Sequence, residues 1–297
     1  MKTCVIYHSI DLDGWMSAAI VKLKYPDVQL LGWNYGDPIP DLSEYDKIIM
    51  CDVSFDPPEM MKLQRENNLI WLDHHISAIR KVYEYYANNG NITDLHGFQD
   101  PKKAACELTW EFFFDQPMPE IVRLLGRYDC FCHKGTNEEQ RVLEFQYGAR
   151  QCISNPEDAL NYLKNYLESD YQAVGILETI QFEGQAIYGY LRIEAKQKYA
   201  KKFDAYFNGY LFACVNAERF NPINFGINYH EEGYDGFASF WYENGKWAIS
   251  FYNDNREVDC SEIAGVFGGG GHKGAAGARL DFLDSFCFYN NQDKSKL

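Results

Sequence analysis

Short apolar runs alternate with segments of helical periodicity through roughly the first 130 residues of the chain. A helix is predicted over residues 15–24, where Met16, Ala19, Ile20 and Leu23 share one face. A second helix is predicted to start at the pair Pro57-Pro58, since proline is favoured in the first helical turn. Four continuous apolar runs predict buried strands: residues 4–7, 28–33, 47–51 and 69–72. This alternation is typical of a mostly parallel sheet with helices on both faces.

The pattern changes in the middle of the chain. Residues 104–202 have helical character almost throughout, and the polar, charged segment 171–202 predicts one long connecting helix. Strand patterns return after residue 208, and Asn244-Gly245 predicts a hairpin turn between two aromatic strands at 236–241 and 247–252. A short amphipathic helix is expected at 257–267, followed by glycines.

The predicted fold class is therefore α/β, in three parts along the chain. Residues 1–170 would form an N-terminal domain with a mostly parallel sheet flanked by helices. Residues 171–207 would form a helical linker, and residues 208–297 a smaller C-terminal α+β domain. The length of 297 residues, of which 46% are hydrophobic, fits two domains better than one.

Charge and cysteine usage narrow the classes of function. A formal net charge of -15 disfavours binding to long duplex nucleic acid, which depends on Lys and Arg neutralising phosphates. A small anionic substrate held by metal ions remains compatible with that charge. The nine cysteines are scattered, strand character begins at Thr3, and neither a signal peptide nor a membrane-spanning stretch is evident. We expect a cytoplasmic protein with reduced thiols and no membrane association.

Acidic residues and histidines follow four of the predicted elements. Because ligands gather at the carboxyl ends of parallel strands, these clusters are expected to meet. A single Asp after a strand is often a helix cap, but so many acids at one sheet edge would repel one another without cations. A mixed His/Asp set favours Mn²⁺, with Mg²⁺ as the alternative. The candidate residues are His8, Asp11, Asp13, Asp52, the triplet Asp73-His74-His75, and Asp129.

These motifs resemble those of a known superfamily. HSIDLDG at 8–14, the lone Asp52, LDHH at 72–75 and GRYD at 126–129 are similar to the four motifs of the DHH phosphoesterases. GVFGGGGHKGAAG at 265–277 resembles the signature of the DHH-associated second domain. That pairing occurs in RecJ-like exonucleases, nano-RNases and phosphodiesterases of cyclic and linear dinucleotides. The resemblance covers nearly the whole chain.

The resemblance implies a role for each catalytic residue. His8 and Asp11 would bind one metal ion, and Asp13, His74 and Asp129 a second, with Asp52 bridging the two. His75 would face the substrate phosphate. Two such cations lower the pKa of a bridging water, which then attacks phosphorus in line.

The glycine motif predicts a substrate-binding element on the second domain. Backbone N–H groups of Gly269, Gly270 and Gly271 would form an anion-binding nest, and His272 would contact a phosphate or a base. The alternative for these glycines is a flexible turn. Relatives often carry an Arg in the strand equivalent to 249–253, which this chain lacks, and Arg256 is the candidate replacement. The active site is expected between the domains.

The function predicted from these features is metal-dependent hydrolysis of short phosphodiesters, with a small phosphorylated or oligonucleotide substrate. One alternative is a phosphoanhydride hydrolase acting on pyrophosphate or polyphosphate, which the glycine–histidine motif argues against. Another is a non-catalytic nucleotide sensor, which the complete set of metal motifs argues against. The sequence leaves open RNA, DNA or a cyclic dinucleotide as substrate, and a monomer or homodimer as the assembly.

Overall fold

The computed structural model describes residues 2–89 and 95–282, apart from the side chain of His272. Internal contacts divide the chain into two compact units between Ile187 and Tyr188. This division falls inside a long helix, and each unit is taken by itself below. The predicted domain borders at 170/171 and 207/208 stay predictions, and residues 283–297 of the third part lie outside the described residues.

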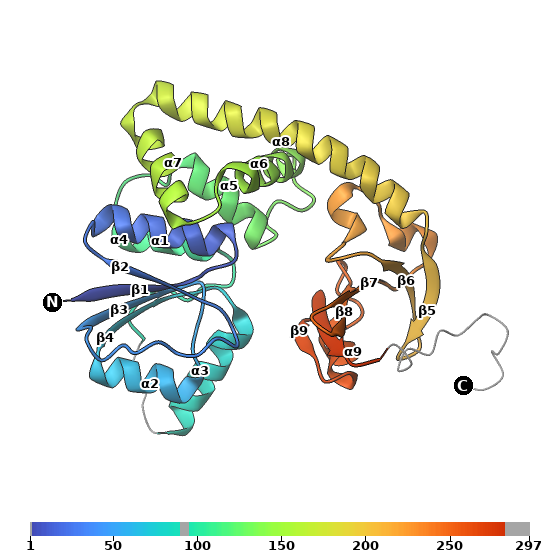
Figure 1. Ribbon diagram of the computed structural model, residues 1–297, viewed down its shortest axis with the longest axis horizontal. Helices are drawn as coiled ribbons and strands as arrows, with labels where there is room; N and C mark the ends of the chain where they lie inside the picture. The colour runs from blue at the N-terminus through green and yellow to red at the C-terminus, as the bar shows by residue number, and fades with distance from the viewer. Residues whose placement is uncertain (1, 90–94, 283–297) are drawn as a thin grey trace. The chain divides into compact units, whose positions relative to one another are not determined.

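The first unit is built on a four-stranded parallel sheet in the order β2-β1-β3-β4 (Figure 1). The strands run over Thr3–His8 (β1), Gln29–Trp33 (β2), Lys47–Cys51 (β3) and Asn68–Leu72 (β4). The two central strands β1 and β3 read as near-continuous apolar runs because helices cover both faces of the sheet. The α/β prediction is confirmed.

Helices lie on both sides of this sheet (Figure 1). Two helices, α2 (Pro57–Glu66) and α3 (Ile76–Asn88), cover one face and share a core with the strands that includes Met50 and Trp71. On the other face lie α1 (Leu12–Lys24) and α4 (Ala105–Phe113). A second core, containing Met16, Trp110 and Phe145, joins them to α5 (Glu120–Asp129), α6 (Glu139–Cys152) and α7 (Pro156–Glu168).

The long helix predicted over residues 171–202 is found as α8, Asp170–Tyr199. Ser169 precedes it and accepts a hydrogen bond from the N–H of Gln172, so its side chain caps the helix start. Within the described residues, no helix is long and apolar enough to cross a membrane. The described cysteines are all free thiols.

The second unit contains a six-stranded mixed sheet in the order β5-β6-β7-β8-β10-β9. Strands β6 and β7 pair in parallel, and the other neighbours are antiparallel. The helix α9 packs on one face of this sheet, against a core that includes Phe212 and Phe251. The elements run over Phe203–Phe207 (β5), Tyr210–Asn216 (β6), Pro222–Phe225 (η1), Tyr229–Glu232 (η2), Gly236–Glu243 (β7), Lys246–Tyr252 (β8), Cys260–Val266 (α9), Gly270–His272 (β9) and Ala275–Leu280 (β10).

The predicted hairpin between β7 and β8 is confirmed. Asn244 and Gly245 have φ angles of 51° and 79°, as a type I′ turn requires at both central positions. Three strands escaped prediction. The first, β5, follows the helix directly and was placed in the linker, whereas β9 and β10 are rich in glycine and alanine, which have low strand propensity.

Candidate metal centre

The predicted cluster forms at the carboxyl edge of the parallel sheet. His8 ends β1, Asp52 directly follows β3 and Asp73 directly follows β4. Since β1, β3 and β4 are neighbours in the sheet, their ends lie at one edge. Asp52 caps no helix and has a left-handed backbone with φ of 65°, while its N–H donates to the carbonyl of Leu72 at 2.9 Å. A left-handed backbone is strained for a residue other than glycine, and here the hydrogen bond to Leu72 holds it in place. Such strain is often found at functional sites.

His8, Asp11 and Asp52 form the first group of potential metal ligands, with ligand atoms within 4.8 Å of one another. The Nδ1 atom of His8 lies 2.7 Å from Oδ2 of Asp11 and 3.4 Å from Oδ2 of Asp52. Asp11 also caps α1, because its Oδ1 accepts the N–H of Gly14 at 2.9 Å. One oxygen thus fixes the start of the helix and the other faces His8.

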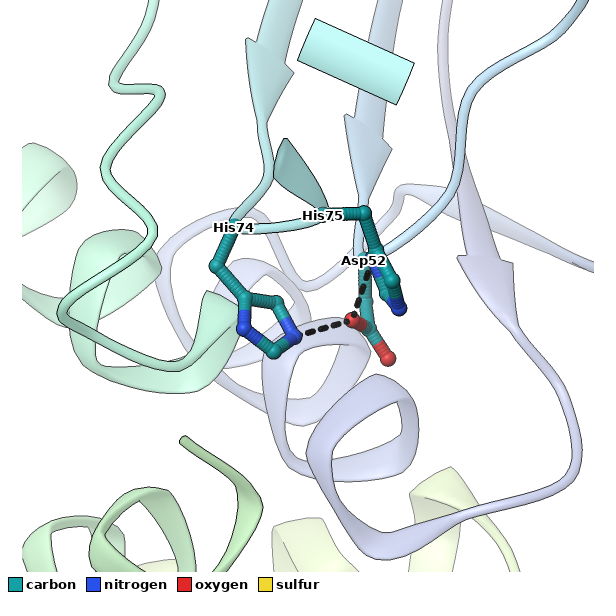
Figure 2. A group of neighbouring side chains, drawn as sticks. All are labelled: Asp52, His74 and His75. Atoms are coloured by element: carbon teal, nitrogen blue, oxygen red, sulfur yellow. Dashed lines mark ion pairs between the residues drawn. The ribbon is translucent and has the colours of Figure 1, made fainter. Parts of the chain in front are cut away.

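Asp13, His74 and Asp129 form a second such group. The Nε2 atom of His74 lies 3.1 Å from Oδ2 of Asp129 and 3.7 Å from Oδ2 of Asp13. It also lies 3.2 Å from Oδ1 of Asp52. Figure 2 shows His74 and His75 approaching the Asp52 carboxylate from the segment after β4. Asp52 therefore contacts both groups, one with each of its carboxylate oxygens.

Asp13 is held by a distant part of the sequence. Its two carboxylate oxygens accept the N–H groups of Ala105 and Cys106 at 2.9 and 2.8 Å. These are the first residues of α4, so the positive end of that helix stabilises the carboxylate. The side chain is almost fully buried, at 2% exposure. Asp13 thus contributes to packing as well as to the cluster.

Asp73 is a candidate residue to which the sequence analysis assigned no role. It is fully buried, and its Oδ1 accepts the backbone N–H groups of His74 and His75 at 2.7 and 3.0 Å. The same oxygen lies 2.8 Å from Nδ1 of His75. Asp73 therefore fixes the backbone that carries both histidines and the ring of His75. The only signal for it was its place in the Asp-His-His triplet.

Gly14 allows the start of α1 to approach β1. A Cβ atom at this position would lie 2.0 Å from the backbone oxygen of His8. No side chain can therefore replace the hydrogen of Gly14 without moving the loop. The close approach holds the start of α1, and with it Asp11, beside His8.

The charges at this edge perturb the protonation of the histidines. Burial by itself lowers the pKa of His8, but Asp11 and Asp52 raise it to about 10. Burial likewise opposes protonation of His74, while Asp129 and Asp52 raise its pKa to about 12. For Asp13, burial together with Asp52 and Asp129 raises the pKa well above the usual range. Added positive charge is therefore favoured at this edge.

The residues present fit divalent cations. The buried atoms His8 Nδ1, Asp52 Oδ1 and His74 Nε2 have charged neighbours but make no hydrogen bond of ordinary geometry with the described residues. Asp129 ends α5, and a carboxylate at the negative end of a helix is unfavourable without a nearby cation. Imidazole nitrogen and carboxylate oxygen together are ligands suited to metals such as Mn²⁺. The groups of Asp and His side chains could thus bind metal.

The glycine motif of the second unit is partly structural. Gly268 has φ of 74°, and its N–H donates to Gly265, while the N–H of Gly269 donates to Ala264. These two bonds form a Schellman motif that ends α9, so the N–H of Gly269 already has a partner. Gly270 and Gly271 lie in β9 and are exposed. Their anion-binding role stays a prediction, as does that of the whole nest.

Arg256 lies near the same hairpin. It is exposed, and a Cβ atom on Gly274 would lie 3.5 Å from its Nε. The backbone of His272 ends β9, and its side chain is outside the described part of the chain. The roles predicted for Arg256 and His272, and a site shared between the units, stay predictions.

The fold and the centre together define an α/β protein with histidines and aspartates that could bind metal at the carboxyl edge of its parallel sheet. No protein-family model matches the chain. An uncharacterized protein of Acanthamoeba polyphaga mimivirus is 24% identical over 307 residues, covering 92% of this chain and 66% of its own length. The chain thus spans about two thirds of the curated relative that it matches.

Solved structures extend the comparison. A pGpG-specific phosphodiesterase, PggH from Vibrio cholerae, has a TM-score of 0.57 at 13% identity, with 96% of this chain and 95% of that chain covered. An exopolyphosphatase-related protein from Bacteroides fragilis has a TM-score of 0.44 at 13% identity, with 93% and 86% covered. At this identity, the likeness to PggH shows a common fold.

Proposed function

We propose that this chain is a metal-dependent phosphoesterase of the DHH type that hydrolyses short phosphodiesters, with Mn²⁺ as its preferred cation. The observation that carries the proposal is the carboxylate of Asp52, which faces His8 with one oxygen and His74 with the other. The order of the four motifs along the chain supports it. The fold shared with a dinucleotide phosphodiesterase is compatible with it.

The residues divide into two ligand sets on this proposal. His8 and Asp11 would hold one cation and Asp13, His74 and Asp129 the other, with Asp52 contributing to both. A pair of divalent cations supplies a hydroxide nucleophile at neutral pH and neutralises charge on the phosphate. Carboxylates and imidazoles that are already positioned by Gly14, α4 and Asp73 lose little further freedom when a cation binds.

His75 would act on the substrate rather than as a required ligand. Asp73 orients its ring through Nδ1 at 2.8 Å, and His75 would present Nε2 to a phosphate oxygen. Burial lowers the pKa of His75, but Asp73 and Asp52 raise it overall, so the ring is favoured as a proton-carrying donor. A charged donor stabilises a phosphate oxygen better than a neutral one.

A turnover panel tests the substrate class. Chelated protein would be reloaded with Mn²⁺ or Mg²⁺ and given short RNA, short DNA, linear and cyclic dinucleotides, and pyrophosphate. We expect metal-dependent release of mononucleotides from the short diesters, with Mn²⁺ more active than Mg²⁺. Preferred hydrolysis of pyrophosphate would replace the proposal with the phosphoanhydride alternative, and tight nucleotide binding without turnover would replace it with the sensor.

Asp52→Asn tests the shared carboxylate. Losing its charge weakens both ligand sets, so we expect reduced content of both cations and a fall in kcat on the order of 10³-fold or more. Asp27→Asn removes the same charge from an exposed position away from the cluster and serves as the matched control. Normal turnover by metal-depleted Asp52→Asn protein would refute the two-cation reading.

A further inference from the structure

The loop after β2 places Tyr35 beside the candidate metal centre. Strand β2 is the neighbour of β1, and His8 is the last residue of β1. The rings of Tyr35 and His8 lie in a T-shaped arrangement, with their centroids 6.4 Å apart. Tyr35 is nevertheless 54% exposed, so more than half of its surface is uncovered at the edge of the sheet where the potential metal ligands gather.

Two contacts fix the side chain of Tyr35. Its hydroxyl oxygen accepts the backbone N–H of Ser54, two residues after Asp52, at 3.3 Å. Its ring also packs in a T-shaped arrangement against the buried ring of Trp33, with centroids 5.4 Å apart. A tyrosine held in this way has little rotamer freedom left to lose, so a ligand that covers its ring would bind with little loss of conformational entropy.

The backbone that carries Tyr35 is held as well. The N–H of Asn34 donates to Oδ2 of Asp37 at 3.0 Å, and the N–H of Asp37 donates to the carbonyl of Asn34 at 2.9 Å. The side-chain oxygen of Asn34 accepts the N–H and the hydroxyl of Ser9 at 3.3 and 3.1 Å. Because Ser9 directly follows His8, the loop that carries Tyr35 is bound to the segment that carries the first potential ligand. The fold therefore sets the position of the ring relative to the centre.

The chemistry of an aromatic ring beside a metal centre narrows what could cover it. The face of such a ring stacks on nucleobases, and this stacking depends little on which base is present. Pyrophosphate and polyphosphate have no flat apolar group and would gain nothing from the ring. A nucleotide joins its base to phosphate through a single sugar, so a phosphate held at the centre would bring a base near the side chain beside His8.

We propose that Tyr35 stacks on one nucleobase of a phosphodiester whose phosphate lies at the metal centre, and so selects nucleotide diesters over phosphate chains. The inference rests on the proposed function and adds to it a residue that recognises the base. Phe131 is the alternative stacking residue, since it is 50% exposed and follows Asp129 by two residues. The ammonium nitrogen of Lys134 already lies over that ring, 4.9 Å from its centroid, which favours Tyr35.

Substitutions of Tyr35 test the role of the ring. Tyr35→Ala should lower kcat/KM for the RNA dinucleotide ApA by roughly 5- to 150-fold, the range expected when a stacking ring is removed. Tyr35→Phe keeps the ring and should retain most of the rate that Tyr35→Ala loses, and both variants should keep the metal content of the unmodified chain. Tyr25→Ala is the matched control: Tyr25 is 37% exposed and lies under Lys47, the first residue of β3, at the opposite edge of the sheet from Asp52. Equal losses in Tyr35→Ala and Tyr25→Ala, or no loss in Tyr35→Ala, would overturn the proposal.

Dinucleotides that lack one base test the contact itself. Two analogues of ApA would carry a stable abasic sugar in place of either the first or the second nucleoside. The loss in Tyr35→Ala should be complete with one analogue and nearly absent with the other, because the missing base leaves the ring nothing to stack on. An equal loss with both analogues would give Tyr35 a structural role only. The expected pattern in Phe131→Ala, and not in Tyr35→Ala, would place the base at Phe131 and overturn the assignment.

Equilibrium binding separates this inference from the proposed function. An ApA analogue with a methylene group in place of one bridging oxygen resists hydrolysis, so its affinity for Mn²⁺-loaded protein can be measured whether or not turnover occurs. The unmodified chain should bind it at least roughly fivefold more tightly than Tyr35→Ala does. If that difference is found but the unmodified chain hydrolyses no diester, the proposed function is wrong and the stacking role of Tyr35 stands. Equal affinities, or no binding by the unmodified chain, would overturn the inference.

Discussion

Replacing Asp73 with Asn separates the orientation of His75 from the binding of metal. Asp73 is fully buried, and one oxygen accepts two backbone N–H groups and faces Nδ1 of His75. Asn has the same shape and keeps a carbonyl oxygen for the backbone donors. It removes the negative charge that holds the His75 ring and raises its pKa, and its NH2 group takes the place of Oδ2, a buried atom that makes no hydrogen bond with the described residues.

The magnitude follows from the bond that is weakened. A hydrogen bond to a charged group contributes about 1.5–3 kcal/mol, against about 0.5–1.5 kcal/mol for a neutral pair. The expected loss is therefore about 1–2 kcal/mol, which is roughly a 5- to 30-fold fall in kcat/KM. Because the folded pKa of His75 drops with the charge, the alkaline limb of the pH–rate profile should move to lower pH.

The assay combines kinetics, metal content and thermal unfolding of the same preparations. Asp73→Asn should keep both cations and lose less thermal stability than Asp73→Ala, since its bonds to the backbone persist and only its NH2 group, at the position of Oδ2, lacks a partner. Asp73→Ala should also lose stability, because two buried N–H groups would then lack a partner. An Asn variant with unchanged kcat/KM and pH profile would refute the positioning role, and one that loses metal would assign Asp73 to the ligand set.

Two further predictions concern stability. In metal-free protein, the pKa of His8 is about 10 when folded against an ordinary value of 6.5, so its stabilising protonation is complete below pH 6.5 and lost as pH rises toward 10. The thermal midpoint of chelated protein should therefore fall across that range, and a midpoint independent of pH would contradict this account. Gly14→Ala should destabilise by about 1–3 kcal/mol in denaturant titrations, because its methyl group would meet the oxygen of His8. Gly265→Ala on α9, where a Cβ has open space, is the control, and equal effects of the two would refute the steric argument.

The fold of the first unit followed from the sequence because its signals are local. A continuous apolar run such as residues 47–51 can be buried on both faces only in a covered sheet, and β3 has those bounds. The second unit was harder. Strand β10 consists of Ala275–Leu280 and depends on pairing with β8 for its conformation, which no local propensity reveals.

In the metal centre too, residues placed by local features could be predicted from the sequence, and residues held by distant parts of the chain could not. The ends of neighbouring strands are local features, so His8, Asp52 and His74 could be placed together from sequence. The support of Asp13 could not, because its donors, Ala105 and Cys106, are about ninety residues away and sit at a helix start that only the folded chain brings near. The role of Asp73 was missed for the opposite reason: its hydrogen bonds are to its own neighbours, and residue type alone does not separate a ligand from a positioning group.

The stability of the fold and the negative charge at this edge of the sheet are therefore linked. Helix α4 donates to Asp13, helix α5 ends in Asp129, and the backbone of Asp52 is strained. The end of α5 is unfavourable for a carboxylate, and the burial of Asp13 and Asp52 raises the pKa of both. Holding these acids together lowers the stability of the fold, and the positive charges of protonated His8 and His74 offset part of that loss. On the proposed function, cations would replace those protons, so metal binding should stabilise the first unit as well as supply its chemistry.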